Sequence, residues 1–158
     1  MSKAVYAGTF DPITNGHLDI AIRASKLFDQ IIVAVADDNY KQTLFTTEER
    51  CQMVTDVIGD IPNAMVDTFS GLLVDYCQRQ GATSVIRGLR VVLDFEKELQ
   101  MALMNRSLHD EIDTVFLMSE AKYLFISSSL VKNAAALDGR IEDLVPPAVA
   151  QALKRKYK

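Results

Sequence analysis

The residues best suited to chemistry lie in one loop, Gly8 to His17, which reads GTFDPITNGH. A short apolar run at 4–7 predicts a buried strand before the loop, and an amphipathic pattern from 17 onward predicts a helix after it. Backbone N–H groups in such a loop can approach an anion, and the positive end of the helix dipole points to the same place. An imidazole at the helix start can donate a hydrogen bond to a phosphate oxygen as negative charge builds on it. The loop therefore predicts a nucleotide-handling site.

Two arginines flank a short turn directly after the predicted strand 84–86, in the sequence RGLR. The planar guanidinium groups of Arg87 and Arg90 match the geometry of phosphate oxygens, so together they could hold two anionic groups. Isolated arginines of this kind are usually solvated at the surface. Their place at a strand end, and the lack of a neighbouring counter-charge, favour the phosphate-binding interpretation.

Three consecutive hydroxyls, Ser127 to Ser129, stand at the start of a predicted helix in the sequence FISSSLVK. One serine is explained as a helix cap, but three offer further donors to a phosphate at the positive end of the helix dipole. Tyr123 and Phe125, just before them, could pack on an adenine ring, although aromatic residues more often belong to the core.

Three more polar residues carry weaker signals. Lys41 lies in the polar loop 37–43, where a lone lysine is usually solvated, and it gains interest because this loop should lie beside the Gly8–His17 loop. Glu98, in the middle of a predicted helix, is by itself a solvated charge. His109 stands near a helix end among acidic residues, and we assign it no role.

Apolar runs alternate with helical patterns along the whole chain. The predicted strands are 4–7, 31–36, 65–69, 84–86 and 114–118, and the predicted helices are 17–29, 47–58, 71–80, 91–108, 128–138 and 147–156. This alternation is typical of a parallel sheet with helices on both faces. We expect a Rossmann-like, doubly wound α/β fold of about five parallel strands in the order 3-2-1-4-5. Ligands of such folds bind at the carboxyl ends of the strands, where all the polar segments above fall.

Length and composition indicate one globular domain spanning 1–158. The chain is 49% hydrophobic and 24% charged, and its net charge of −4 argues against a general nucleic-acid-binding protein. No apolar run approaches the roughly 20 residues that cross a bilayer, and no signal peptide is visible, so we expect a cytoplasmic protein without membrane contact. Cys51 and Cys77 fall on apolar stripes of predicted helices, which indicates buried thiols rather than a disulfide or a metal site.

Together these segments resemble those of the bacterial phosphopantetheine adenylyltransferases, within the nucleotidyltransferase superfamily. Thr14 gives the first motif the form T-x-G-H, whereas many relatives, such as nicotinate-mononucleotide adenylyltransferases and cytidylyltransferases, have H-x-G-H. The resemblance extends from residue 3 to about residue 133 and includes IRGLR, DFEKELQMALMNR and FISSSLVK. It implies transfer of AMP from ATP to 4′-phosphopantetheine, which yields dephospho-coenzyme A and pyrophosphate without a covalent enzyme intermediate.

The resemblance also implies roles for individual residues. His17 stabilises the transition state at the α-phosphate of ATP. The residues implied for the acceptor are Thr9, Lys41, Arg87 and, along the pantetheine arm, Leu73. The residues implied for ATP are Thr9, Phe10, His17, Gly88, Leu89, Arg90, Glu98, Tyr123, Leu124, Phe125, Ile126, Ser127, Ser128 and Ser129. Mg²⁺ accompanies ATP, and the sequence offers no convincing protein ligand for it.

The same resemblance implies a homohexamer with coenzyme A as a feedback ligand. Three features depart from the commoner pattern of the family. Ala7 stands in place of proline and Tyr123 in place of tryptophan, while Asp37 and Asp38 put acidic charge beside Lys41 and bear on the geometry of the acceptor loop.

Two other functions stay open. One is a nucleotidyltransferase with another acceptor, such as nicotinate mononucleotide; Thr14 and the pair of Lys41 and Arg87 speak against it. The other is a nucleotide-binding regulatory module without turnover, which would have no need of a transition-state donor such as His17.

Overall fold

In the computed structural model, which describes residues 1–38 and 41–158, five parallel strands form one sheet in the order β3-β2-β1-β4-β5. The predicted strand order and direction are confirmed. The strands are β1 (Lys3–Gly8), β2 (Gln30–Ala36), β3 (Ala64–Phe69), β4 (Ser84–Leu89) and β5 (Asp113–Met118). The helices are α1 (Asn15–Ser25), α2 (Thr47–Ile58), α3 (Leu73–Gln80), α4 (Val92–Leu108), the short η1 (Ala121–Tyr123), α5 (Ser128–Ala136) and α6 (Pro147–Lys156).

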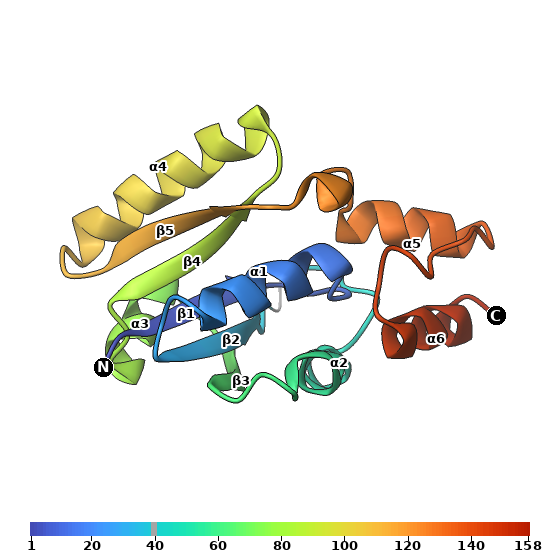
Figure 1. Ribbon diagram of the computed structural model, residues 1–158, viewed down its shortest axis with the longest axis horizontal. Coiled ribbons are helices and arrows are strands. Elements are labelled where there is room, and N and C mark those ends of the chain that lie inside the picture. Colours follow the sequence, from blue (N-terminus) through green and yellow to red (C-terminus); the bar gives the residue numbers. More distant parts are fainter. Residues whose placement is uncertain (39–40) are drawn as a thin grey trace.

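Helices cover both faces of the sheet, as Figure 1 shows. On one face, residues of α1, α2, α5 and α6 share a core with strand residues such as Ile31, Val33 and Ile86. On the other face, Val74 and Cys77 of α3 pack against the alternate residues of the same strands. The central strands β1 and β2 contribute to both cores. They are therefore apolar along their length, which explains why the sequence shows continuous runs there rather than alternation.

Two helices near the cavity described below begin with capping boxes. The predicted extent of α2 is confirmed residue for residue, because the Glu49 N–H donates to Thr46 Oγ1 (3.2 Å) and the Thr46 N–H donates to Glu49 Oε2 (2.9 Å). α1 begins at Asn15, earlier than predicted, because Thr14 caps it and the side chain of His17 completes a second capping box. The imidazole singled out from the sequence is therefore part of a helix start.

β4 is longer than predicted. It ends at Leu89 rather than at Ile86, and its last residues still pair with β5. The sequence did not predict this extension, because glycine is uncommon inside strands. A glycine in a strand often marks a place where another part of the chain approaches the backbone closely. Here a Cβ on Gly88 would lie 3.2 Å from the side chain of Ile20 in α1. Arg87 consequently projects from the sheet itself and not from a loop after it.

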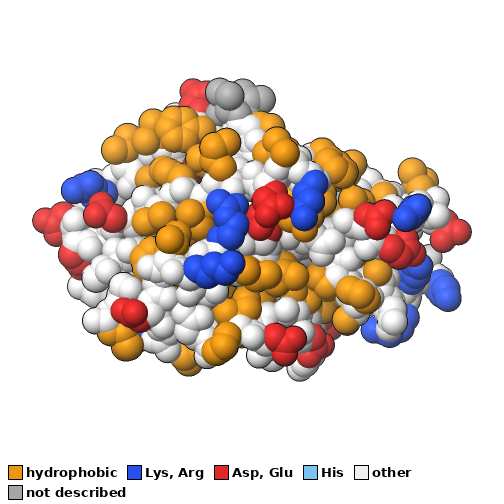
Figure 2. Space-filling model, in the orientation of Figure 1, with side chains coloured by type: hydrophobic (Ala, Val, Ile, Leu, Met, Phe, Trp, Pro, Cys, Tyr) orange, Lys and Arg blue, Asp and Glu red, His pale blue; other side chains and the backbone are white. Residues whose placement is uncertain are grey.

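The apolar stripe of α4 is only partly covered by the rest of the described chain. Phe95, Leu99 and Leu103 recur at helical spacing, and the Phe95 ring meets that of Phe116 in β5 at 5.9 Å between centroids. The three stripe residues nevertheless remain 44%, 39% and 61% exposed. Figure 2 shows hydrophobic side chains gathered over the part of the molecule that α4 occupies in Figure 1. An exposed apolar surface of this kind indicates a contact surface.

The two cysteines are free thiols. Cys77 is buried in α3, as predicted, and burial raises the pKa of its thiol to about 12. The prediction for Cys51 is wrong in part, because it lies beside the buried stripe of Met53 and Val54 on α2 and is partly exposed. No helix among the described residues is long and apolar enough to cross a membrane.

Candidate active site

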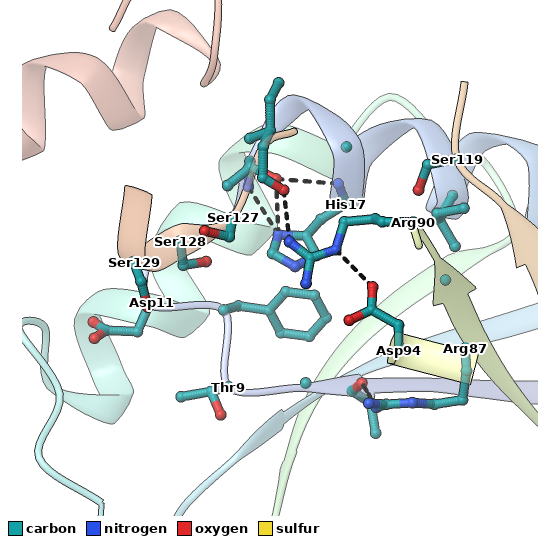
Figure 3. A pocket seen from close by; sticks show the side chains of 18 of the residues that line it. Thr9, Asp11, His17, Arg87, Arg90, Asp94, Ser119, Ser127, Ser128 and Ser129 are labelled. Atoms are coloured by element: carbon teal, nitrogen blue, oxygen red, sulfur yellow. Dashed lines mark hydrogen bonds and ion pairs between the residues drawn. The ribbon is translucent and has the colours of Figure 1, made fainter. Parts of the chain in front are cut away.

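A cavity of about 530 Å³ opens at the carboxyl ends of the strands and is lined by all four segments that the sequence singled out. Figure 3 shows it from close by. The predicted site residues that line it are Thr9, Phe10, His17, Lys41, Arg87, Gly88, Arg90, Glu98, Tyr123, Ile126, Ser127, Ser128 and Ser129. Four predicted residues do not line it, namely Leu73, Leu89, Leu124 and Phe125. Of these, Leu73 packs against the core on the α3 face of the sheet and Phe125 is largely exposed.

His17 enters the cavity as a neutral hydrogen-bond donor. The Thr14 N–H donates to His17 Nδ1 at 3.0 Å (Figure 3). Because a backbone N–H can only donate, Nδ1 is unprotonated and the ring proton resides on Nε2. Burial, followed by the positive charges of Arg90 and Arg87, lowers the pKa of His17 to about 4. The ring of Phe10 meets the imidazole edge to face, with centroids 5.1 Å apart. At pH 7 the ring therefore presents one N–H and no charge.

Arg87 is held by a carboxylate, contrary to the expectation that it has no counter-charge nearby. Its Nε and Nη2 donate to the two carboxylate oxygens of Glu98, each at 2.7 Å, and Nη1 donates to the Ala7 carbonyl at 2.9 Å. Burial by itself would lower the pKa of Arg87, but the hydrogen bonds and charge of Glu98 raise it. The guanidinium stays charged, and two of its five N–H groups remain for a ligand in the cavity.

Arg90 joins the end of β4 to the serine-containing segment. Its Nε donates to Asp94 Oδ2 at 3.2 Å, and its Nη1 donates to the Ile126 carbonyl at 2.9 Å. The carboxylate belongs to the first turn of α4, four residues after the arginine. Arg90 thus holds two lining segments in place and keeps its positive charge beside His17.

The two aspartates before Lys41 have different partners. Asp37 Oδ1 accepts the hydroxyl hydrogen of Thr47 at 2.7 Å, so it serves the start of α2. Asp38 lies 3.5 Å from Lys41 Nζ, which also donates to Thr9 Oγ1 at 3.4 Å. The side chain of Lys41 is half-exposed, so this cation can approach a ligand at the mouth of the cavity.

The three serines differ in their local roles. Ser127 is the cap of α5 and accepts the Leu130 N–H at 3.1 Å, whereas Ser128 donates to the Pro12 carbonyl at 2.8 Å. Ser129 lines the cavity with them. Two of the hydroxyls therefore tie α5 to its own start and to the Gly8–His17 loop, and all three serines line the cavity.

Sequence reasoning assigned no role to Lys132 and Asp11, which both line the cavity. Lys132 Nζ lies 2.7 Å from Asp11 Oδ2, and the same buried carboxylate accepts the N–H groups of Leu44 and Phe45. A signal for Lys132 was present, because it follows Ser128 by one helical turn and shares its face of α5. Further lining residues that received no role include Tyr6, Asp94 and Ser119.

Each carboxylate that lines the cavity is paired with a cation. The pairs are Asp11 with Lys132, Asp94 with Arg90 and Glu98 with Arg87. Lys41 adds a fourth cation, whose partner Asp38 does not line the cavity, so the lining residues themselves carry a net positive charge on a chain of net charge −4. Within the described residues, no group of three or more His, Cys, Asp and Glu could hold a metal ion. The cavity therefore offers cations and N–H donors to a polyanion.

Comparison with known proteins agrees with this chemistry. The family model described as cytidylyltransferase-like matches residues 5–134. The chain is 54% identical over 157 residues to the phosphopantetheine adenylyltransferase of Moorella thermoacetica, covering 99% of this chain and 98% of that protein. It is 56% identical over 154 residues to the phosphopantetheine adenylyltransferase of Geotalea daltonii, covering 98% and 96%.

A solved structure supports the fold. The nicotinic acid mononucleotide adenylyltransferase of Plasmodium falciparum, complexed with NaAD, superposes with a TM-score of 0.72 over 99% of this chain and 95% of that one. The two sequences are 18% identical, so this likeness concerns the arrangement of strands and helices alone.

Proposed function

The chain belongs to the family of phosphopantetheine adenylyltransferases, and we propose that its cavity transfers the adenylyl group of ATP to 4′-phosphopantetheine through the neutral imidazole of His17. An oxygen of the acceptor phosphate attacks the α-phosphorus of ATP and forms a new P–O bond. The bond from the α-phosphorus to the bridging oxygen of the β-phosphate breaks, and its electron pair leaves with pyrophosphate. The products are dephospho-coenzyme A and pyrophosphate.

The observation that carries the proposal is the single Nε2–H of His17, fixed at the start of α1 among cations. Negative charge grows on the α-phosphate oxygens as the acceptor approaches. A donor aimed at those oxygens stabilises the transition state more than the substrates. Since the imidazole is already neutral and oriented, it needs no reorganisation during the step. Phosphoryl-type transfer of this kind depends on positioning and electrostatics more than on covalent chemistry.

Arg87 and Lys41 form the acceptor side of the proposed site. Arg87 reaches the 4′-phosphate with the N–H groups that Glu98 and Ala7 leave over, and Lys41 approaches it from the mouth of the cavity beside Thr9. The pantetheine arm then extends toward Leu73 at the start of α3.

The ATP side of the proposed site lies between β4 and the segment before α5. Its residues are Thr9, Phe10, Gly88, Leu89, Arg90, Glu98 and those from Tyr123 to Ser129. Arg90 has the clearest support, because Asp94 and the Ile126 carbonyl orient it toward the polyphosphate. Mg²⁺ would enter with ATP and would screen the charge of its phosphates; because each carboxylate of the lining is paired with a cation, we assign the ion no protein ligand.

The proposed enzyme is a cytoplasmic homohexamer, with coenzyme A as a feedback ligand that shares the skeleton of the product. The exposed stripe of Phe95, Leu99 and Leu103 on α4 supports contact between copies of the chain. Light scattering should give a mass well above the 17.6 kDa of one chain, and a monomer would contradict the assembly.

The acceptor is tested by pyrophosphate release from ATP and Mg²⁺ with 4′-phosphopantetheine, with nicotinate mononucleotide, or with no acceptor. We expect turnover with 4′-phosphopantetheine alone. Turnover with nicotinate mononucleotide would assign another acceptor to the cavity. ATP binding without pyrophosphate release in any mixture would identify a binding module.

A further inference from the structure

Arg50 is a buried cation that does not line the cavity. It lies in the first turn of α2 and is only 3% exposed. Its guanidinium donates to three carbonyls and a hydroxyl: Nη1 to Thr9 O (2.7 Å) and Ala36 O (2.9 Å), Nε to Phe45 O (3.3 Å), and Nη2 to Thr47 Oγ1 (3.0 Å). All these partners are neutral.

The acidic groups around Arg50 are engaged elsewhere. Asp11 pairs with Lys132, Glu49 with Lys156, and Asp37 accepts the hydroxyl of Thr47. Among the described residues, no carboxylate lies within ion-pair distance of its guanidinium. A buried charge is costly for folding unless it is hydrogen-bonded, and the four acceptors of Arg50 offset part of that cost. An apolar side chain would leave these acceptors without a donor, so the place selects a planar group with several N–H donors.

The carbonyls that Arg50 binds belong to the two loops that carry cavity residues. Thr9 follows β1 and precedes His17 in the Gly8–His17 loop. Ala36 is the last residue of β2 and precedes the Lys41 loop, and Phe45 follows that loop just before α2. One planar guanidinium thus joins both ends of the Lys41 loop to the backbone of Thr9, whose hydroxyl is in turn 3.4 Å from Lys41 Nζ.

We propose that Arg50 is a positioning residue that fixes the Lys41 loop against Thr9 and places a buried positive charge behind them. The ligand that responds is the anionic group held there, which is the phosphate of the acceptor. This inference rests on the proposed function for the identity of that group. In a poorly solvated setting the charge acts on an anion more strongly than a surface cation does. The planar fork matters as well, because a lysine ammonium does not reach four acceptors arranged around one plane.

The test compares Arg50→Lys, Arg50→Met and the control Arg155→Lys, which changes an exposed arginine on α6. Steady-state pyrophosphate release gives kcat and the KM for each substrate, and thermal melting reports folding. We expect Arg50→Lys to lower kcat/KM for the acceptor roughly tenfold, mainly through KM, with the KM for ATP changed by no more than about threefold. Arg50→Met loses the charge as well and should lower kcat/KM for the acceptor roughly a hundredfold. Arg155→Lys should match the wild type.

Two results would overturn the inference. One is a folded Arg50→Lys protein with the acceptor KM of the wild type. The other is a loss of kcat in proportion to the folded fraction with both KM values unchanged, which is what a purely structural residue produces. If Arg50→Met does not fold, the acceptor KM of Arg50→Lys alone tests the inference. A wild-type protein without turnover would contradict the proposed function instead. The role of Arg50 would then be tested by calorimetry, which compares the affinities of the wild type and Arg50→Lys for 4′-phosphopantetheine.

Discussion

The two sides of the cavity hold their donors in opposite ways. On the α1 side, the backbone N–H of Thr14 fixes a neutral imidazole, that of His17. On the β4 side, the Glu98 carboxylate holds the charged guanidinium of Arg87 by two bonds of 2.7 Å. Guanidinium charge attracts phosphates that are already anionic in the ground state, whereas a lone neutral donor matters most where charge grows in the transition state. The two sides should therefore affect different kinetic parameters.

The largest effect is expected from His17→Ala. Losing the donor should lower kcat by about 10²–10³-fold and leave both KM values within a few-fold of the wild type, because the lost hydrogen bond forms mainly in the transition state. Steady-state pyrophosphate release at saturating substrates measures this.

His109→Ala is the matched control for that measurement. His109 lies outside the cavity, between Asp75 and Glu111, and should be replaceable without loss of kcat. A His17→Ala enzyme with a raised KM and an unchanged kcat would mean that the imidazole binds substrate and that the two sides do not differ.

A smaller effect, seen in KM, is expected from Arg87→Lys. The substitution keeps the positive charge but loses the paired bonds to Glu98 that orient the group proposed to bind the acceptor phosphate. The KM for the acceptor should rise roughly tenfold, which is the change in affinity expected from the loss of one charge-assisted hydrogen bond. The decrease in kcat should be smaller. If the KM for ATP rises instead, Arg87 belongs to the nucleotide side, together with Glu98.

The smallest effect is a pH dependence of stability with opposite signs for the two histidines. Burial lowers the pKa of His17 to about 4, below its unfolded value of about 6.5, so its stabilising effect is full above about pH 6.5 and is lost as the pH falls toward 4. The hydrogen bond with Asp75 raises the pKa of His109. Its stabilising effect is full below about pH 6.5 and is lost as the pH rises through the folded pKa.

Thermal melting of His17→Gln and His109→Gln against the wild type, in steps from pH 4 to 8, separates these contributions. The destabilisation caused by His17→Gln should shrink toward pH 4, and that caused by His109→Gln should shrink toward pH 8. Differences that stay constant with pH in both variants would contradict the assigned protonation states.

Topology explains why so much of the cavity could be predicted from the sequence. Alternating strands and helices indicate a parallel sheet, and the carboxyl ends of parallel strands meet at one edge. Loops as distant as those of His17, Arg90 and Ser129 are therefore expected to meet, and all three line the cavity. The start of α2 could be placed to the residue because Thr46 and Glu49 form a local capping box.

Contacts that depend on packing left no such signal. Glu98 reads as a solvated helix charge because its pairing with Arg87 requires α4 to fold back beside β4. Arg50 was missed because three of its four acceptors are backbone carbonyls, which any sequence supplies. Helical periodicity marked the stripe through Leu99 on α4, but it does not distinguish a core-facing stripe from one left for another chain.

The most direct test of the central claim is the protonation state of the His17 ring in solution. The chain has two histidines, so imidazole ¹⁵N spectra of the labelled protein are simple, and His17→Gln assigns the signals. At pH 7 we predict a neutral His17 ring with its proton on Nε2 and an unprotonated Nδ1 that accepts the Thr14 N–H. An imidazolium at pH 7, or a neutral ring protonated on Nδ1, would contradict the account, because the proposed donor to the α-phosphate is the N–H of a neutral ring protonated on Nε2.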